Sequence, residues 1–467
     1  MMKEKHAYNE NVPMPVKKQK KGSYIEPGTV FPHRKRYTCI DLFAGCGGLS
    51  LGLEQAGFTP ILFSEINLNA AETYMANRKG KEIIPVGDVY SLTDANLAVL
   101  KSYWRLHRGI DDVDLVCGGP PCQGFSGIGH RRTFRLEKKD IPSNHLFQEM
   151  IRVISAVRPK IFLFENVKGL LVSKWSAEGR NGEIFKQVHS EFSRIPGYSV
   201  RYELVHAKDY GVPQNRPRVL MVGLRQDVFW KSEQMSFSLS REVDLAEYDS
   251  GRLELPKPSA IAHGFLPKSS GIPPTMCELL SDLEDPNYFS KTETDSYPSE
   301  PQNEFQKMLR TLPNGKTLGR GDALTEQEYS KHRPEIRKKF EYMIANNGEI
   351  PAAMRTKKFA QRVLPKTWPD NGPNITACSL PEDYVHYCQP RGPTVREWAR
   401  IQTFPDWYIF TGPRTTGGRR RAGDPSLGIW TRDVPRYTQI GNAVPVLLAQ
   451  KVGEHLVKLL NREVIPS

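Results

Sequence analysis

The sequence predicts an α/β domain built on a parallel β-sheet, followed by a second domain of irregular structure. Between residues 37 and 225, short apolar runs alternate with stretches of helical periodicity. From about residue 226 to 430 this pattern weakens, and proline, glycine, serine and charged residues become frequent. The length of 467 residues exceeds one ordinary domain, and a hydrophobic content of 39% is sufficient for a packed core.

The strands of the first domain are predicted from buried apolar runs. Five runs alternate with amphipathic stretches, which predicts parallel strands covered by helices on both faces. Two further runs follow close together, and helical spacing of apolar residues predicts a helix over residues 145–157. A strong amphipathic helix from Gly441 to about residue 460 is expected to dock back on the first domain. The predicted strands are residues 38–43, 59–65, 82–86, 113–118, 160–166, 199–207 and 218–225.

Composition excludes several classes of protein. No apolar run approaches the ~18 residues needed to cross a bilayer, and the first residues lack the apolar stretch of a secretory signal. The seven cysteines are an odd number and include no C-x-x-C pair, which argues against a disulfide framework or a zinc ribbon. We therefore expect a cytoplasmic monomer without a membrane segment or a metal.

The net charge of +13 favours a polyanionic partner such as nucleic acid. Residues 1–36 carry nine Lys or Arg against three Glu, which is +6 of the total. The basic run from Lys17 to Lys21 fits a solvated tail better than a specific site, although such a tail would strengthen non-specific binding to phosphates.

A glycine-rich turn and two carboxylates indicate a nucleoside pocket. Gly45, Gly47 and Gly48 lie between the first strand and a helix, where they permit close approach of a ligand. Glu65 ends the second strand and can accept ribose hydroxyls, while Asp88 follows the third and can accept an adenine amino group. Each feature alone fits a packing turn or a helix cap. The turn lacks the G-x-G-x-x-G spacing, which argues against a dinucleotide.

Reactive groups follow the next two strands. The segment PPCQGFS presents Cys122 after two prolines, and a deprotonated cysteine is a good nucleophile. Glu165 ends the next strand and is expected to face the same crevice, unless it forms an ordinary surface ion pair. Arg216 and Arg218 are two residues apart at the start of a later strand, so alternation places both on one face, where they can hold a carboxylate or a phosphate.

Taken together, these residues resemble the cytosine-5 DNA methyltransferase family. The motifs that carry the resemblance occur in order from Asp41 to the terminal helix: the glycine turn, PPCQGFS, FENV, QNRPRVLMVG, RGPTVREWARIQTFPDW and QIGNAVP. The resemblance implies a Rossmann-like class I methyltransferase domain with a smaller target-recognition domain. The corresponding boundaries are a basic extension at 1–36, a catalytic domain at 37–225, a recognition domain at 226–430 and a returning segment at 431–467.

The resemblance also implies S-adenosylmethionine as methyl donor and double-stranded DNA as substrate, in a bacterial modification enzyme with a cognate restriction endonuclease. Its cofactor-binding positions fall on Phe43, Gly45, Gly47, Glu65, Ile66, Asp88, Val89, Pro121 and Asn442. Its catalytic positions fall on Cys122, Glu165, Arg216 and Arg218. Its substrate-binding positions fall on Gln123, Ser126, Asn166 and Thr376.

Three rival functions are weaker. An RNA methyltransferase would use the same chemistry, but the large second domain favours duplex DNA. A non-catalytic DNA-binding relative would be expected to lose Cys122 or Glu165, and both are present. A nicotinamide-dependent dehydrogenase would share the sheet, but its glycine spacing differs.

Overall fold

The structure is a computed structural model that describes residues 36–121, 142–176, 178–230, 260–355, 361–366, 373–375, 383–415 and 433–461. Within these ranges, seven strands form one sheet in the order β3-β2-β1-β4-β5-β7-β6. The strands are β1 (Tyr37–Leu42), β2 (Phe58–Ser64), β3 (Ile84–Val86), β4 (Leu115–Gly118), β5 (Ile161–Val167), β6 (Tyr198–His206) and β7 (Pro217–Arg225). The predicted strands are thus confirmed, with ends shifted by one or two residues.

The sheet is parallel except at β7. Strands β1 to β5 pair in parallel, whereas β7 is antiparallel to both β5 and β6. The link between β6 and β7 spans only residues 207–216, and so short a connection joins antiparallel neighbours. The mixed α/β fold predicted from the sequence is confirmed.

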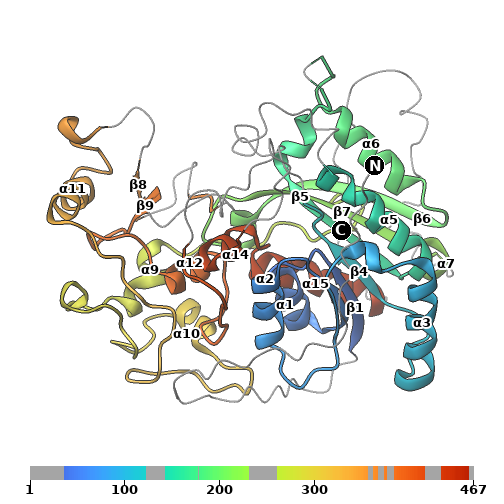
Figure 1. Cartoon of the computed structure of the whole chain (residues 1–467), viewed down its shortest axis with the longest axis horizontal. Helices are drawn as coiled ribbons and strands as arrows, with labels where there is room; N and C mark the ends of the chain where they lie inside the picture. Colours follow the sequence, from blue (N-terminus) through green and yellow to red (C-terminus); the bar gives the residue numbers. More distant parts are fainter. Residues whose placement is uncertain are drawn as a thin grey trace, which may run out of the picture.

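Helices cover both faces of the sheet (Figure 1). Alternate strand residues point to opposite faces, so Cys39 packs with α1 and α15 while Ile40 packs with α3, α5 and α6. The helices of this part are α1 (Gly48–Ala56), α2 (Leu68–Ala76), α3 (Asp94–Arg108), α5 (Leu146–Val157), α6 (Glu183–Ser193), α7 (Gln226–Phe229), α14 (Arg436–Asn442) and α15 (Val446–Asn461).

The terminal helix begins later than predicted. The sequence predicted one helix from Gly441, but α14 ends at Asn442 and α15 starts at Val446. Pro445 explains the break, because proline lacks an N–H and disfavours helical backbone in the residue before it. Ala443, which follows the last residue of α14, is already extended, with ψ of 150°. The predicted docking is confirmed, since Leu448, Val452 and Leu456 lie in the core beneath the sheet.

The second part of the chain has short elements around a third hydrophobic core, in addition to the two cores on the faces of the sheet. Its elements are α9 (Met276–Leu280), α10 (Glu304–Arg310), α11 (Pro334–Ala345), α12 (Val395–Ile401), β8 (Arg362–Val363) and β9 (Tyr384–Val385). It lies beside the sheet domain at the α1 and α14 end (Figure 1). The hydrophobic cores do not divide at the predicted boundary between residues 225 and 226. Phe265 belongs to a core of the sheet domain, while Leu51 of α1 packs in the third core.

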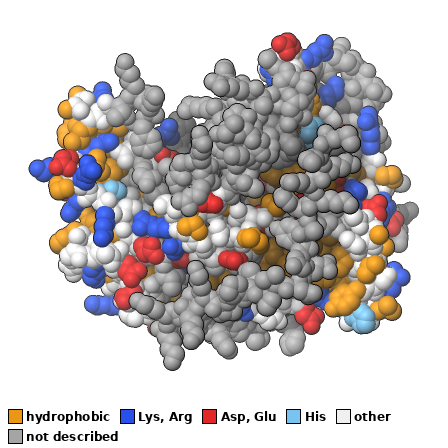
Figure 2. Space-filling model, viewed as in Figure 1, with side chains coloured by type: hydrophobic (Ala, Val, Ile, Leu, Met, Phe, Trp, Pro, Cys, Tyr) orange, Lys and Arg blue, Asp and Glu red, His pale blue; other side chains and the backbone are white. Residues whose placement is uncertain are grey.

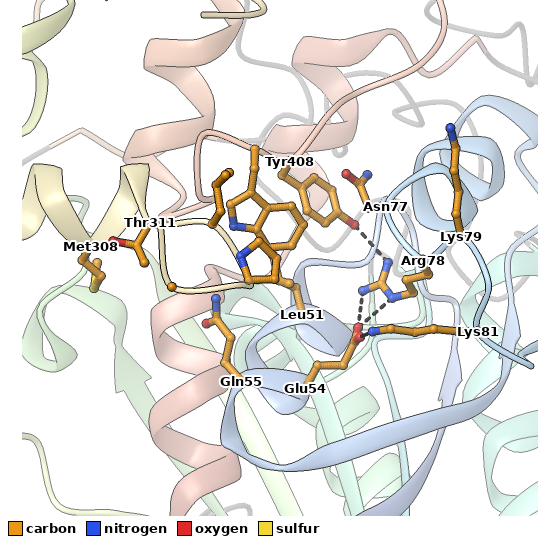
Figure 3. Close-up of a pocket in the computed structure, with 14 residues that line it drawn as sticks. Leu51, Glu54, Gln55, Asn77, Arg78, Lys79, Lys81, Met308, Thr311 and Tyr408 are labelled. Atoms are coloured by element: carbon orange, nitrogen blue, oxygen red, sulfur yellow. Dashed lines mark hydrogen bonds and ion pairs between the residues drawn. The ribbon is translucent and has the colours of Figure 1, made fainter. Parts of the chain in front are cut away.

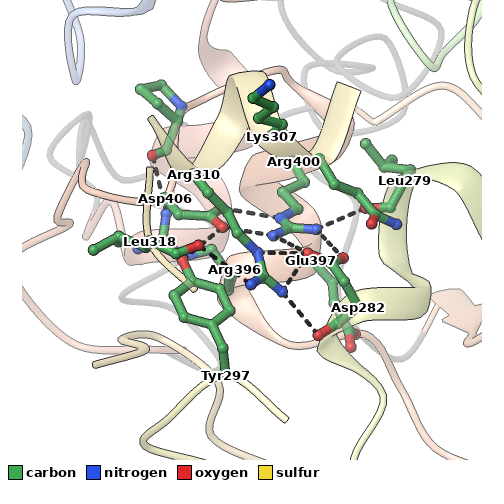
Figure 4. Close-up of polar contacts among 12 residues, drawn as sticks. Leu279, Asp282, Tyr297, Lys307, Arg310, Leu318, Arg396, Glu397, Arg400 and Asp406 are labelled. Atoms are coloured by element: carbon green, nitrogen blue, oxygen red, sulfur yellow. Dashed lines mark hydrogen bonds and ion pairs between the residues drawn. The ribbon is translucent and has the colours of Figure 1, made fainter. Parts of the chain in front are cut away.

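Buried ion pairs hold this second part together (Figure 4). Asp282 is fully buried and pairs with Arg310 at 2.6 Å and with Arg400 at 2.5 Å. Arg400 also pairs with Asp406 at 2.6 Å, and Tyr297 donates to Asp406 at 2.8 Å. Asp282, Arg310, Arg400 and Asp406 therefore each have a partner of opposite charge, which offsets the cost of burying them.

Candidate active site

Five residues form a row across the carboxyl ends of the parallel strands. Strand register aligns Val86, Ser64, Leu42, Gly118 and Phe164 on neighbouring strands. The residue after each of these therefore lies at the same edge of the sheet, where α/β proteins place their ligands. In sheet order, this row is Gly87, Glu65, Phe43, Gly119 and Glu165.

The glycine-rich turn after β1 has one packed side and one open side. Phe43, Gly45 and Gly47 all have positive φ, at 58°, 57° and 86°. A Cβ on Gly47 would lie within 2.9 Å of Tyr74, Arg78 and Tyr408, so only glycine fits there. A Cβ on Gly45 would meet nothing within 4 Å. The turn thus leaves room for a ligand on the Gly45 side.

Glu65 is held beside this open space. One of its oxygens accepts the Gly45 N–H at 2.8 Å, and the other accepts the Asn67 N–H at 2.7 Å. Burial raises the pKa of Glu65, while the two backbone hydrogen bonds act in the opposite direction. Both oxygens retain further acceptor capacity for a hydroxyl pair.

The neighbouring positions supply an apolar side chain and another carboxylate. Ile66 is 73% exposed, which is unusual for isoleucine and marks an uncovered apolar surface. Asp88 is exposed and accepts the Tyr90 N–H at 3.1 Å, while Val89 is buried. The structure therefore brings Glu65, Ile66 and Asp88 to one edge beside the glycine turn.

Glu165 pairs with Arg218 across two strands. The Arg218 Nε lies 2.5 Å from a Glu165 oxygen, and both side chains are largely buried. Arg218 faces Val167 in the β5–β7 register, so the ion pair is a diagonal contact on one sheet face. A Cβ on Gly119 would lie 2.6 Å from the other Glu165 oxygen. Gly119 therefore leaves the space that this carboxylate occupies.

Asn166 fixes the loop that leads to Cys122. Its side-chain N–H₂ donates to the Pro120 carbonyl at 3.2 Å, and its side-chain oxygen accepts the Val167 N–H. Pro121 is exposed and is the last described residue before the predicted nucleophile. The predictions for Cys122, Gln123, Ser126 and Thr376 fall outside the described residues.

Arg216 and Arg218 make different contacts. Arg216 is buried and donates to the backbone carbonyls of Ile375, Gly441 at 2.8 Å and Ala443 at 3.0 Å. Burial lowers the pKa of Arg216, and the charge of Arg218 lowers it further. Arg216 therefore joins the start of β7 to the backbone at residue 375 and at residues 441–443. The side chain of Asn442, at the end of α14, is exposed.

Two buried glutamines complete this junction and were not predicted as site residues. Gln214 donates to the Gln402 side-chain oxygen at 2.6 Å and accepts the Ile375 N–H at 3.2 Å. Gln402 in turn donates to the carbonyls of Ile440 and Ala443. Both belong to quoted motifs, QNRPR and IQTFPDW, but a glutamine in a motif does not by itself indicate burial.

Neither a metal centre nor a membrane segment is found among the described residues. Within those ranges, no group of three or more His, Cys, Asp or Glu is placed to hold a metal ion. No described helix is both long and apolar enough to cross a membrane.

Comparison with known proteins identifies the family. Residues 37–458 match the family described as C-5 cytosine-specific DNA methylase. The chain therefore belongs to this family and is a DNA cytosine methyltransferase. It is 33% identical to the Type II methyltransferase M.DdeI of Desulfomicrobium norvegicum, over 89% of this chain and 88% of that protein. It is 28% identical to the Type II methyltransferase M1.HphI of Haemophilus parahaemolyticus, over 91% and 88%.

The fold is also found in a solved structure. A protein provisionally described as a DNA modification methyltransferase of an Escherichia coli prophage superposes with a TM-score of 0.59. The match covers 91% of this chain and 99% of that one at 24% identity, and so concerns the fold alone.

Proposed function

We propose that this chain methylates carbon 5 of a cytosine within a specific duplex DNA sequence, with S-adenosylmethionine as the donor and Cys122 as the nucleophile. We further propose a modification enzyme that acts in the cytoplasm beside a cognate restriction endonuclease. The relatives named as Type II methyltransferases support this setting. The observation that carries the proposal is the row at the sheet edge, where the glycine turn and the Glu165–Arg218 pair flank the strand that leads to Cys122.

The open side of the glycine turn fits the donor. Glu65 can accept the two ribose hydroxyls, and Asp88 can accept an amino group of the purine. The exposed side chain of Ile66 offers an apolar surface for the flat base. When bound, S-adenosylmethionine supplies an electrophilic methyl group on a sulfonium. Asn442 would close this pocket from the far end of the chain.

The remaining groups act on the cytosine, which must first leave the stacked duplex at a cost of a few kcal/mol. The Cys122 thiolate forms a bond to carbon 6, which breaks the aromaticity of the ring and makes carbon 5 electron-rich. Glu165, held by Arg218, hydrogen-bonds or protonates ring nitrogen 3 as negative charge develops there. Carbon 5 then takes the methyl group. Loss of the carbon-5 proton to a base expels Cys122 and restores the ring.

The test is covalent trapping with DNA that carries 5-fluorocytosine at the target. Fluorine cannot leave as a proton does, so the adduct between enzyme and base should persist. We expect trapping by the wild type and none by Cys122→Ala, with cofactor affinity nearly unchanged in this variant.

Cys117→Ala is the matched control, because Cys117 lies on β4, the strand that precedes Cys122 in the sequence, but is buried, and burial raises the pKa of its thiol. It should still form the adduct. Turnover or trapping by Cys122→Ala would contradict the assignment of the nucleophile.

A further inference from the structure

A buried arginine lies directly behind the glycine turn. Arg78 follows α2 and is 2% exposed. Its guanidinium donates to Glu54 of α1 at 2.6 Å and to the Tyr408 hydroxyl at 3.1 Å (Figure 3). It also donates to the Gly47 carbonyl at 3.4 Å. One side chain thus joins both helices that flank the turn to the turn itself.

Tyr408 makes a second contact with the same turn from the far part of the chain. Its hydroxyl donates to the Cys46 carbonyl at 2.6 Å while accepting from Arg78, so each proton has one acceptor. The Tyr408 side chain is fully buried. The carbonyls of Cys46 and Gly47, which are consecutive in the turn, are therefore both held from the packed side.

Charge balance keeps the arginine in place. Burial opposes the ionisation of Glu54, but the charges of Arg78 and Lys81 together hold the pKa of that carboxyl below its usual value. Lys81 contacts the second Glu54 oxygen at 2.5 Å. The guanidinium of Arg78 also lies 3.8 Å from the ring centre of Tyr74, a cation–π contact. A lysine at position 78 could reproduce the charge but not these several contacts.

The segment that carries Tyr408 is itself attached to α2. Asn77 accepts the Ile409 N–H at 2.9 Å and donates to the Ile409 carbonyl at 2.9 Å. Thr73 accepts the Thr411 N–H at 2.9 Å. The position of Tyr408 is therefore fixed relative to the first domain by contacts other than its own hydroxyl.

We propose that Arg78 and Tyr408 are positioning residues that set the affinity for the methyl donor, by fixing the backbone of the turn on which the donor rests. This inference depends on the donor site proposed above. Neither residue faces the open Gly45 side, and neither contacts Glu165 or Arg218. Their loss should therefore weaken donor binding and leave the chemical step nearly unchanged.

The experiment measures the affinity for S-adenosylhomocysteine by calorimetry in Tyr408→Phe and Arg78→Lys. Tyr408→Phe removes one oxygen and leaves a buried carbonyl without its donor, which should weaken binding about tenfold. In steady state, KM for S-adenosylmethionine should rise in proportion, while kcat and KM for DNA stay within about twofold. The split between KM and kcat separates positioning from general loss of stability.

Tyr198→Phe is the matched control. Tyr198 is also buried, and its hydroxyl donates to the carbonyl of Pro159, at the amino end of β5 and away from the turn. Tyr198→Phe should lower the melting temperature about as much as Tyr408→Phe does, without changing the affinity for the donor. Wild-type affinity in Tyr408→Phe, or an equal loss of affinity in Tyr198→Phe, would overturn the inference.

Glu65→Ala distinguishes failure of the inference from failure of the proposed donor site. Glu65 lies on the open side of the turn, so its loss should weaken binding if the donor lies there. If Glu65→Ala weakens binding and Tyr408→Phe does not, only the positioning role is wrong. If neither variant changes the affinity, the donor site and the inference are both wrong.

Discussion

At the scale of single residues, the site depends on glycines, which leave space for neighbouring groups, as much as on residues with large side chains. Gly119 leaves the volume taken by one Glu165 oxygen, and Gly47 leaves the volume taken by Tyr74, Arg78 and Tyr408. Gly47 belongs to the glycine-rich turn, and Gly119 directly precedes PPCQGFS, so the sequence makes both positions visible. What each glycine makes room for is not visible, because the partners are distant in sequence. The sequence thus predicted the glycine turn but not Arg78 or Tyr408 behind it.

Asp41 gives a prediction about pH at this scale. It is buried at the end of β1, accepts the Ser50 hydroxyl at 2.5 Å, and burial raises its pKa from 3.8 to about 7. The folded protein therefore binds a proton more tightly than the unfolded chain. The stability that this proton contributes is complete below pH 4 and is lost as pH rises through 7. The difference corresponds to about 4 kcal/mol at most.

Asp41→Asn removes this titration, so its free energy of unfolding relative to wild type should increase between pH 5 and pH 8. Urea denaturation at the two pH values measures the change. Equal differences at both pH values would show that Asp41 is ionised throughout.

The two arginines of QNRPR show where residue-scale prediction stops. Alternation predicted that both lie on one face of the strand, where they could hold a carboxylate, and Arg218 does pair with the Glu165 carboxylate. Arg216 instead donates to the backbone carbonyls of Ile375, Gly441 and Ala443, which lie more than 150 residues further along the chain. A local pattern indicates the face on which a side chain lies, but its partner depends on tertiary contacts.

At the scale of elements, the terminal helix is held by the smallest side chains of α1. A Cβ on Gly52 would lie 2.3 Å from the Val446 carbonyl and 2.5 Å from the Ala449 Cβ, and one on Gly453 would lie 2.7 Å from the Ala56 Cβ. The two helices therefore approach closely. Helix α1 begins at the glycine turn, and α15 follows Asn442 at the end of α14. Contact between α1 and α15 therefore also sets the position of the glycine turn relative to Asn442 in the proposed donor site.

Gly52→Ala tests this contact. Alanine favours a helix over glycine by up to about 1 kcal/mol, so an exposed site would gain stability. Here the added methyl must separate α1 from α15, and overpacking costs about 1–3 kcal/mol. We expect net destabilisation in urea denaturation. Gly87→Ala is the control, since a Cβ there meets nothing within 4 Å; stabilisation by Gly52→Ala would mean that the helices adjust freely.

At the scale of the whole molecule, the two parts of the chain differ in how well the sequence predicted them. The sheet domain follows periodic apolar patterns, so its strands were predicted to within two residues and α5 to within one, whereas the terminal helix begins at Val446 and not at Gly441. The second part buries Arg310, Arg396 and Arg400 within its core (Figure 4), and Arg391 is buried as well. Charged residues in a sequence normally indicate surface. The core of this part could therefore not be recognised from composition, and only its irregularity was predicted.

Charge distribution gives the last prediction. On the face shown in Figure 2, the described Lys and Arg side chains are interspersed with Asp and Glu around α10 and α11. By contrast, residues 1–36 carry +6 of the net +13 in a short stretch of which only Arg36 lies within the described ranges. The lysines of this stretch, such as those from Lys17 to Lys21, lack the regular aromatic interleaving of a base reader, and such a basic run binds phosphates. Residues 1–36 should therefore add affinity for DNA without adding sequence choice.

Deletion of residues 1–36 tests this division of roles. Each phosphate contact contributes about −0.9 to the slope of log affinity against log salt. The truncated enzyme should therefore show a slope shallower by about one to three units, with weaker binding at low salt. The set of methylated sequences should not change, because base contacts are expected from the second part of the chain. Both quantities can be measured, by titrations at several salt concentrations and by mapping methylated cytosines in a host that lacks its own methylation. A changed or relaxed set of sites would show that residues 1–36 take part in reading the DNA sequence.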